Sequence, residues 1–179
     1  MTFNLPIFLT LLRILAIPLV VVFFYLGYPL VAATIFGLAG VTDWADGYYA
    51  RKLGLESRFG AFLDPVADKL IVAVALILVV SQEANLWITL AACIIIGREI
   101  VISALREWMA ESGQSSKVAV ASLGKIKTVA QIFALIFLLY NQPLFGFPIH
   151  EAGLVLLAIA TILTVWSMVL YLHSAFKRD

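Results

Sequence analysis

Two pairs of aspartates have a spacing from which chemistry can be inferred. Asp43 and Asp46 are three residues apart, and Asp64 and Asp68 are four apart. Each spacing places both carboxylates of a pair on one face of a helix. Four carboxylates close together repel one another unless they are protonated or bound to cations. Because the ligands are all oxygen atoms, the sequence predicts a site for two divalent ions, Mg²⁺ or Mn²⁺ rather than zinc.

The residues around these acids suit chemistry at phosphorus. Gly47 and Gly60 have no side chain, so a helix or a ligand can approach the acids closely. Arg51 shares a helix face with Asp43 and Asp46 and could bind a phosphate. Metal ions at such a site would neutralise an attacked phosphate group during in-line displacement. The alternative is that the acids form ion pairs with nearby basic residues, but four acids and two glycines at this spacing favour the metal site.

A second group of charged residues, later in the chain, could bind an anionic acceptor. Arg98 and Arg106 are eight residues apart, which is about 80° around a helix, so both can point into one pocket. A substrate that carries a phosphate needs such cations. Their alternative role is to pair with neighbouring glutamates or to extend toward the membrane interface. Lys125 and Lys127 are two apart and diverge on a regular helix, so we expect one of the two to reach the site.

These charges belong to a chain with the composition of a membrane protein. Of its 179 residues, 63% are hydrophobic and 13% are charged, whereas soluble domains average about 45–50% apolar and about 25% charged residues. The formal net charge of +1 gives no indication of a nucleic-acid partner, and we expect none. The chain is therefore expected to lie in a lipid bilayer.

The apolar stretches predict six membrane-spanning helices. A spanning helix needs about 20 mainly apolar residues. The charge-free stretch 14–42 is too long for one crossing and too short for two, so it holds the inner parts of two helices joined by a turn at 27–29. The same reasoning predicts helices at 5–27, 30–53, 60–82, 86–110, 118–140 and 151–174. The sequence thus predicts an all-α polytopic membrane protein with a single domain over residues 1–179.

Basic residues predict the orientation of these helices. All 12 Lys and Arg residues fall at one set of helix ends, and the opposite turns contain none. Cytoplasmic loops and helix ends carry the excess of Lys and Arg in membrane proteins. Both termini and the charged candidate site are therefore expected on the cytoplasmic side.

The residue order from Asp43 to Asp68 resembles the signature of the CDP-alcohol phosphotransferase family. The chain reads D-x-x-D-G-x-x-A-R, then eight residues, then G-x-x-x-D-x-x-x-D, without departure from that signature. The resemblance implies a six-helix membrane fold, usually dimeric, with two metal ions, a CDP-linked donor and release of CMP.

The resemblance also implies roles for individual residues. The metal-binding acids of the family are matched by Asp43, Asp46, Asp64 and Asp68. Asp68 also matches the proposed general base. The positions that contact the CDP part of the donor are matched by Gly47, Arg51 and Ser57. On the first helix, we expect Thr10 and Arg13 to close the site for the donor, CDP-diacylglycerol.

Three further segments are similar to bacterial members of the family that use glycerol 3-phosphate as the acceptor. These segments are residues 3–13, 97–111 and 124–128. The resemblance implies an enzyme that transfers the phosphatidyl group of CDP-diacylglycerol to glycerol 3-phosphate. It implies a homodimer among the lipids of the bacterial inner membrane. The acceptor's phosphate would be bound by Arg98, Arg106, Lys125 and Lys127.

Two alternatives to this reaction stay open. Another member of the family would use a different acceptor, such as serine, inositol phosphate or phosphatidylglycerol. A small cation transporter would use the acids as an ion path. Against the transporter, the acids cluster at one membrane face, and the opposite half of the bilayer lacks the polar residues that would complete a path.

Overall fold

The computed structural model describes residues 5–53, 58–111, 121–144 and 146–176, without the side chains of 5–6, 43–53, 58–59, 61, 121–125 and 174–176. These residues form six α-helices: α1 (Leu5–Tyr25), α2 (Pro29–Leu53), α3 (Arg58–Gln82), α4 (Leu86–Glu111), α5 (Ala121–Tyr140) and α6 (Ile149–Phe176). The prediction of an all-α fold with six helices is confirmed. Each predicted helix end that falls on a described residue lies within two residues of the observed end. The predicted start of the fifth helix, residue 118, lies outside the described residues.

The turn between α1 and α2 has the hydrogen bonds of a helix that ends on a glycine. Tyr28 N–H donates to the Phe23 carbonyl at 2.9 Å, and Gly27 N–H donates to the Phe24 carbonyl at 3.2 Å. Gly27 has a φ of 78°, a left-handed conformation that glycine adopts at little cost. Pro29 then begins α2, because its fixed φ suits the first turn of a helix. The predicted turn at 27–29 is thus confirmed.

Asparagines also lie at the start of α4 and just after the end of α5. The Trp87 N–H donates to Asn85 Oδ1 at 2.9 Å, so Asn85 caps the start of α4. After α5, Asn141 adopts a φ of 45°, and asparagine tolerates this left-handed region better than most residues. Both asparagines lie at the side of the bundle where the helix ends and turns contain no Lys or Arg.

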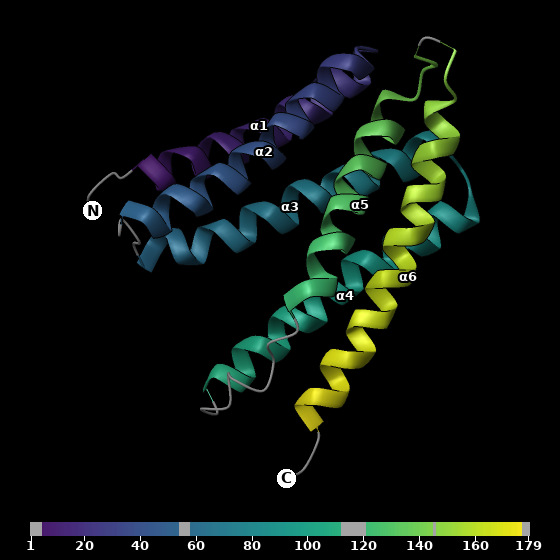
Figure 1. Ribbon diagram of the computed structural model, residues 1–179. Coiled ribbons are helices and arrows are strands. Elements are labelled where there is room, and N and C mark those ends of the chain that lie inside the picture. Colours follow the sequence, from purple (N-terminus) through teal and green to yellow (C-terminus); the bar gives the residue numbers. More distant parts are fainter. Residues whose placement is uncertain (1–4, 54–57, 112–120, 145, 177–179) are drawn as a thin grey trace.

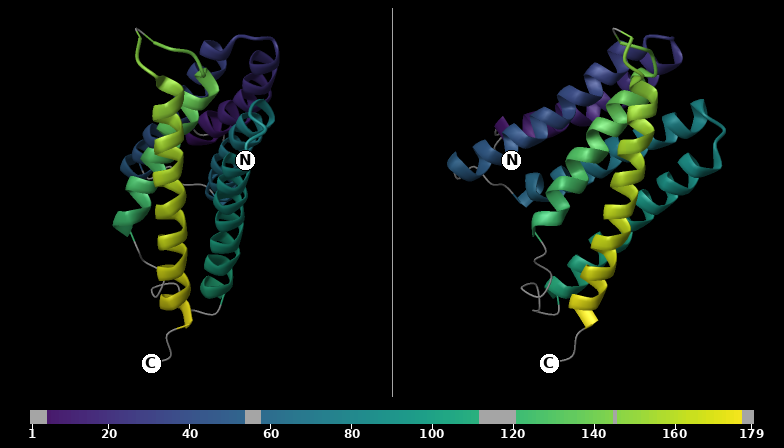
Figure 2. Two further views of the ribbon diagram at one scale, coloured as in Figure 1. Left: turned by 90° about the vertical axis from the view of Figure 1, so that its right-hand side faces the viewer. Right: turned by 45° about the vertical axis from the view of Figure 1, so that its right-hand side comes forward.

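Helices α1–α3 form one group, which diverges from α4 and α6 toward the start of α1 and the end of α6. Figure 1 shows α1 beside α2 and α5 beside α6, and α3 contacts α1, α4 and α5. Toward the start of α1 and the end of α6, the α1–α3 group runs away from α4 and α6 (Figures 1 and 2). The acids of the predicted site are on α2 and α3, and Arg98 and Arg106 are on α4, so the two predicted sets of charged residues lie on different groups.

Small residues allow close helix packing within the bundle. Ala75, Ala134 and Ala160 are fully buried. A Cβ atom added at Gly153 of α6 would lie 2.9 Å from Leu138 Cγ of α5. Close approach of this kind is typical of membrane helices, where small residues rather than a hydrophobic driving force bring helices together.

The outer surface of the bundle is apolar. Within the part of the chain that the structure describes, three helices are long and apolar enough to cross a membrane: Ile7–Tyr25, Leu86–Glu111 and Ile149–His173. Shorter apolar segments are Pro29–Thr42 and Ile126–Tyr140. Large apolar side chains such as Leu15 and Trp166 point outward, each 62% exposed. Exposed apolar surface on this scale indicates contact with lipid, so the chain is a membrane protein, as predicted.

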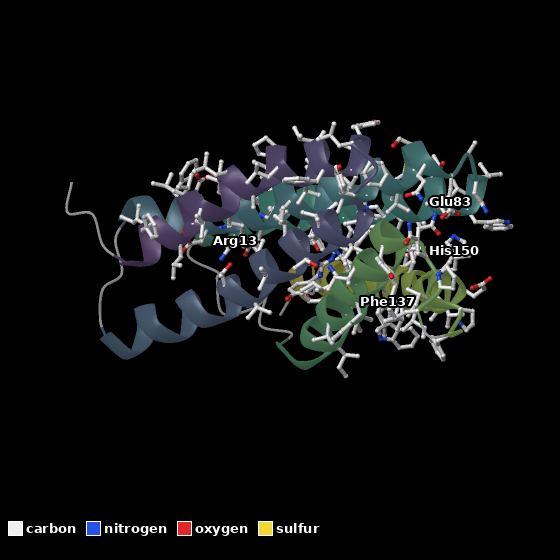
Figure 3. The ribbon with its side chains drawn as sticks, turned by 90° about the horizontal axis from the view of Figure 1, so that it is seen from above. Arg13, Glu83, Phe137 and His150 are labelled. Carbon is white, nitrogen blue, oxygen red and sulfur yellow. The ribbon has the colours of Figure 1, made fainter. Side chains whose placement is uncertain are left out.

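One polar contact joins the ends of the bundle that are remote from the predicted site. His150 Nε2 at the start of α6 lies 2.6 Å from Glu83 Oε1 in the turn after α3. Figure 3 shows these two side chains beside each other, at the opposite end of the molecule from Arg13. The contact ties α6 to the turn between α3 and α4.

Candidate active site

The second acid pair is held by α1. Thr10 Oγ1 donates a hydrogen bond to Asp64 Oδ1, and Arg13 Nη1 donates one to Asp68 Oδ1. Thr10 and Arg13 are three residues apart on α1, and the acids are four apart on α3, so the two contacts follow one another along the packed helices. The prediction that Asp64 and Asp68 share a helix face is confirmed, and that face meets α1.

Burial differs sharply across the contact between Arg13 and Asp68. The side chain of Arg13 is 1% exposed, whereas that of Asp68 is 40% exposed. A buried cation is costly unless it is paired, and Asp68 supplies the opposite charge. The hydrogen bond from Arg13 favours the observed orientation of the carboxylate. Asp68 can therefore face a substrate while Arg13 holds it from inside the bundle.

The contacts of Asp64 and Asp68 fit a role in binding metal ions. Carboxylates that bind metals are commonly held by a hydrogen bond from a neighbouring residue. A carboxylate has two oxygens and about four lone-pair positions, so a hydrogen bond to Oδ1 is compatible with a metal ligand on the same group. Oxygen ligands of this kind suit Mg²⁺ or Mn²⁺.

The first acid pair lies on the last part of α2. Its backbone is helical through Asp43, Asp46, Gly47 and Arg51, so the three-residue spacing lies on a helix, as predicted. The side chains of these residues are outside the part of the chain that the structure describes, and Ser57 lies outside it entirely. Among the side chains that are described, no group of three or more His, Cys, Asp or Glu residues is placed to bind a metal.

A network of charged side chains joins α4, α5 and α6. The carboxylate of Glu99 accepts hydrogen bonds from Arg98 Nη1 at 3.0 Å and from Lys127 Nζ. Arg98 Nη2 donates to Ser167 Oγ of α6 at 3.3 Å. Arg98 is 8% exposed and Lys127 4% exposed. Buried cations are stable only when they are paired and hydrogen-bonded, and Glu99 provides the charge for both.

Arg106 extends this network toward the end of α4. Its Nη2 donates to the hydroxyl of Tyr171 at 2.5 Å, and its Cζ lies 5.1 Å from the centre of the Tyr171 ring. Arg98 Cζ lies 5.5 Å from the same ring. Arg98 and Arg106 therefore meet one residue of α6, which confirms the prediction that they share a helix face.

The charges of this network do not cancel. Arg98, Arg106 and Lys127 carry three positive charges against one negative charge on Glu99, which leaves two positive charges. A phosphate monoester carries about −1.5 to −2 at pH 7. The net charge of these four residues therefore has the sign that would attract an anionic group. We call these residues, with Ser167 and Tyr171, the cation cluster.

A cavity of about 180 Å³ lies between α3 and α4. Lys69 and Glu99 line it together with six apolar residues. Lys69 follows Asp68 in the sequence, and Glu99 follows Arg98. The cavity is thus an apolar recess between the helix of the second acid pair and the helix that begins the cation cluster.

Comparison with known proteins decides the family. A family model described as CDP-alcohol phosphatidyltransferase matches residues 3–166. The chain belongs to this family. The match includes all four acids and the cation cluster up to α6, although it stops before Ser167 and Tyr171.

Members of the CDP-alcohol phosphatidyltransferase family from several bacteria are similar over nearly the whole chain. A protein from Haemophilus influenzae is 53% identical over 98% of this chain and 95% of its own length. Proteins from Escherichia coli K12 and Salmonella choleraesuis are each 51% identical, over 98% of this chain and 96% of their own lengths. All three carry the name "CDP-diacylglycerol--glycerol-3-phosphate 3-phosphatidyltransferase".

Some residues of this CDP-alcohol phosphatidyltransferase have neighbours that the sequence did not indicate. We expected Thr10 and Arg13 to close the donor site, and the structure places both against acids of α3. Contact with the donor stays a prediction for these two residues. Of the two lysines, Lys127 joins the cation cluster, while the side chain of Lys125 lies outside the described residues.

Two residues of the cation cluster were missed by sequence reasoning. Glu99 is one of the neighbouring glutamates expected to pair with Arg98 and Arg106, and its contact with Lys127 was not foreseen. Ser167 and Tyr171 were not considered. Their signal was available, because they are four residues apart in an otherwise apolar segment of α6, and such a spacing puts both on one helix face.

Proposed function

We propose that this chain transfers the phosphatidyl group of CDP-diacylglycerol to sn-glycerol 3-phosphate, giving phosphatidylglycerophosphate and CMP. The observation that carries the proposal is the cation cluster, whose two excess positive charges suit a phosphate monoester as the acceptor. The names of relatives that are 51–53% identical over nearly the whole chain support the same donor and acceptor.

The acceptor site is formed by the cation cluster. Arg98, Arg106 and Lys127 bind the phosphate of glycerol 3-phosphate, and Lys125 is a further candidate from the same helix. Arginine suits this task because its planar guanidinium can donate two parallel hydrogen bonds to phosphate oxygens. A serine acceptor has no phosphate and would leave the excess positive charge of these cations uncompensated. The cluster therefore favours glycerol 3-phosphate over serine, and the assay below separates it from inositol phosphate and phosphatidylglycerol.

The donor site is formed by the family signature. Two Mg²⁺ or Mn²⁺ ions would be held by Asp43, Asp46, Asp64 and Asp68. Such ions, when bound, neutralise the pyrophosphate of the donor and favour displacement at phosphorus. Gly47, Arg51 and Ser57 contact the CDP part of the donor. Thr10 and Arg13 fix the orientation of Asp64 and Asp68 through the hydrogen bonds described above.

Asp68 acts as the general base of the reaction. It accepts the proton from the 1-hydroxyl of glycerol 3-phosphate while that oxygen attacks the β-phosphorus of the donor. A bond forms between the acceptor oxygen and this phosphorus, and the bond between the phosphorus and the bridging oxygen breaks, so CMP leaves with both electrons of that bond. The partial exposure of the Asp68 side chain supports this role, because the acceptor must reach it.

The enzyme acts as a single catalytic domain over residues 1–179 and as a homodimer, with its six helices in the bacterial inner membrane. Both termini and the active site face the cytoplasm, which the one-sided distribution of the 12 basic residues supports. Cysteines introduced at Gln142 and Glu111, with Cys93 replaced by serine, should be labelled from opposite sides of the membrane. Labelling of both from one side would contradict this topology.

The proposed reaction is tested with the purified protein in detergent. CMP release from CDP-diacylglycerol is measured with glycerol 3-phosphate, serine, inositol phosphate or phosphatidylglycerol, and the lipid product is identified by mass spectrometry. We expect release only with glycerol 3-phosphate, and loss of release in Asp68→Asn. Release with another acceptor would assign a different reaction of the family. Ion flux through proteoliposomes without any CMP release would favour the transporter.

A further inference from the structure

Tyr171 lies at the meeting point of the two arginines of the cation cluster. Its ring centre is 5.5 Å from Arg98 Cζ and 5.1 Å from Arg106 Cζ. The arginines are eight residues apart on α4, which corresponds to about 12 Å along a helix. Both guanidinium groups nevertheless approach the same ring. Tyr171 thus lies where two cations from separate turns of α4 converge.

Tyr171 is packed in an apolar cluster in addition to its contacts with the arginines. The residue is 4% exposed and forms a small apolar cluster with Ile102 and Met109 of α4. Met168 and Leu105 pack against the same cluster. A buried side chain in such contacts has little freedom to change its rotamer. The ring therefore offers a fixed surface against which flexible arginine side chains can be held.

Arg106 gains most from this surface. Arg106 is exposed to solvent. Its Nη2 donates a hydrogen bond to the Tyr171 hydroxyl at 2.5 Å. A long side chain in such a position loses rotamer freedom when it binds a ligand. The face of an aromatic ring attracts a guanidinium, and the hydroxyl accepts one of its five N–H donors. Tyr171 can therefore orient Arg106 before a ligand arrives.

Arg98 is oriented by a second residue of α6, Ser167. Its Nη2 donates to Ser167 Oγ at 3.3 Å, and Ser167 precedes Tyr171 by one helical turn. Ser167 is 1% exposed, so its position is also fixed by packing. One face of α6 thus orients both arginines of α4.

We propose that Tyr171 is a positioning residue for the acceptor: it holds Arg106 and Arg98 so that both guanidinium groups bind one phosphate. The inference rests on the proposed function, in which these arginines bind the phosphate of glycerol 3-phosphate. It adds α6 to the parts of the chain that determine acceptor affinity. Tyr171 acts through the arginines and does not need to touch the acceptor.

The experiment compares Tyr171→Phe and Tyr171→Leu with the wild-type protein, all full-length and purified in detergent. The phenylalanine keeps the ring and loses the hydroxyl, whereas the leucine loses both. Loss of the hydrogen bond is expected to raise the KM for glycerol 3-phosphate about 3- to 10-fold, and loss of the ring as well about 10- to 100-fold. The KM for CDP-diacylglycerol should stay within about twofold, because the donor binds at the family signature. The dissociation constant of glycerol 3-phosphate, measured by calorimetry, should rise in parallel.

Met168→Ala is the matched control. It removes packing from the same apolar cluster and leaves both arginine contacts with the ring in place. We expect it to lower the thermal midpoint while the KM for glycerol 3-phosphate stays within about twofold. A merely structural role for Tyr171 predicts that Met168→Ala and Tyr171→Leu behave alike.

Three results would overturn the inference: an unchanged KM for glycerol 3-phosphate in both Tyr171 variants, an equal rise in the KM of donor and acceptor, or the same rise in Met168→Ala. If the leucine variant does not fold, the phenylalanine variant decides by the same criteria. A wild-type protein that neither binds nor uses glycerol 3-phosphate would overturn the proposed function, and this inference with it. A wild-type protein that uses it, with unaffected Tyr171 variants, would overturn this inference alone.

Discussion

Arg13 of α1 donates a hydrogen bond to Asp68 of α3 and is almost completely buried, while the aspartate remains 40% exposed. The buried Arg13 thus positions the exposed carboxylate of Asp68. The pair joins two helices that are separated in the sequence by the whole of α2. A change in the packing of α1 would therefore reach the proposed general base directly.

Arg13→Ala is expected to lower kcat about 10- to 100-fold, which is the usual cost of removing a residue that orients a metal-binding or catalytic carboxylate. Arg13→Lys keeps the charge but not the planar guanidinium, so its kcat should be intermediate. CMP release at saturating substrates measures the effect. Leu12→Ala is the control, because Leu12 is 47% exposed on the same helix. An unchanged kcat in Arg13→Ala would show that Asp68 does not depend on this contact.

Asp68→Asn should separate the general base from the metal ligands. Loss of a general base typically costs about 10²–10⁴-fold in rate, while binding of CDP-diacylglycerol should be largely retained. Asp43→Asn and Asp64→Asn should lose both, because the pyrophosphate of the donor binds through the metal ions. Rates come from CMP release, and donor binding from equilibrium measurements with metal present. An equal loss of donor binding in all three variants would reduce Asp68 to a metal ligand.

Removal of divalent metal should abolish activity and lower stability. The four acids repel one another without cations, so the protein should have a lower thermal midpoint after EDTA. Binding of an ion at 100 times its Kd stabilises a protein by about 2.7 kcal/mol. Mg²⁺ or Mn²⁺ should restore both activity and midpoint, measured in parallel. Full CMP release after thorough chelation would contradict the two-metal site.

Glu99→Gln is expected to destabilise the fold, because Lys127 and Arg98 are buried and share this carboxylate. Loss of hydrogen bonds to charged groups should cost about 1.5–3 kcal/mol, measured as a lower thermal midpoint in detergent. Replacing Lys127 by methionine as well should cost less than the sum of the two single changes, since the buried cation is then gone. Additive effects would show that the two residues do not interact.

The sequence was sufficient for features that depend on one helix at a time. The period of an α-helix places Arg98 and Arg106 on one face, and the structure confirms it through their shared neighbour on α6. The turn at 27–29 was equally local, because a glycine and a proline determine its backbone. Such predictions need only the sequence spacing and the conformational preferences of single residues.

The contacts between helices could not be predicted in the same way. Arg13 and Asp68 are 55 residues apart, and Lys127 and Glu99 are 28 apart. Whether two such side chains meet depends on how each helix is rotated about its axis and where the helices cross, which the periodicity of one helix does not determine. For the same reason, the contact between His150 and Glu83 could not be foreseen from the sequence.

The close contact of Gly153 with Leu138 limits how α6 can tilt against α5, and a small change in this tilt would displace the far end of α6. Tyr171 follows this glycine by eighteen residues, about 27 Å along the helix, so a tilt of about 5° at the glycine would move the tyrosine ring by about 2 Å. Gly153→Ala would force such an adjustment, because its Cβ would lie 2.9 Å from Leu138 Cγ. We expect its KM for glycerol 3-phosphate to rise in steady-state assays, and an unchanged KM would show that α5 absorbs the displacement. The affinity of the proposed acceptor site would then depend on the absence of a side chain at a position about 27 Å away along α6.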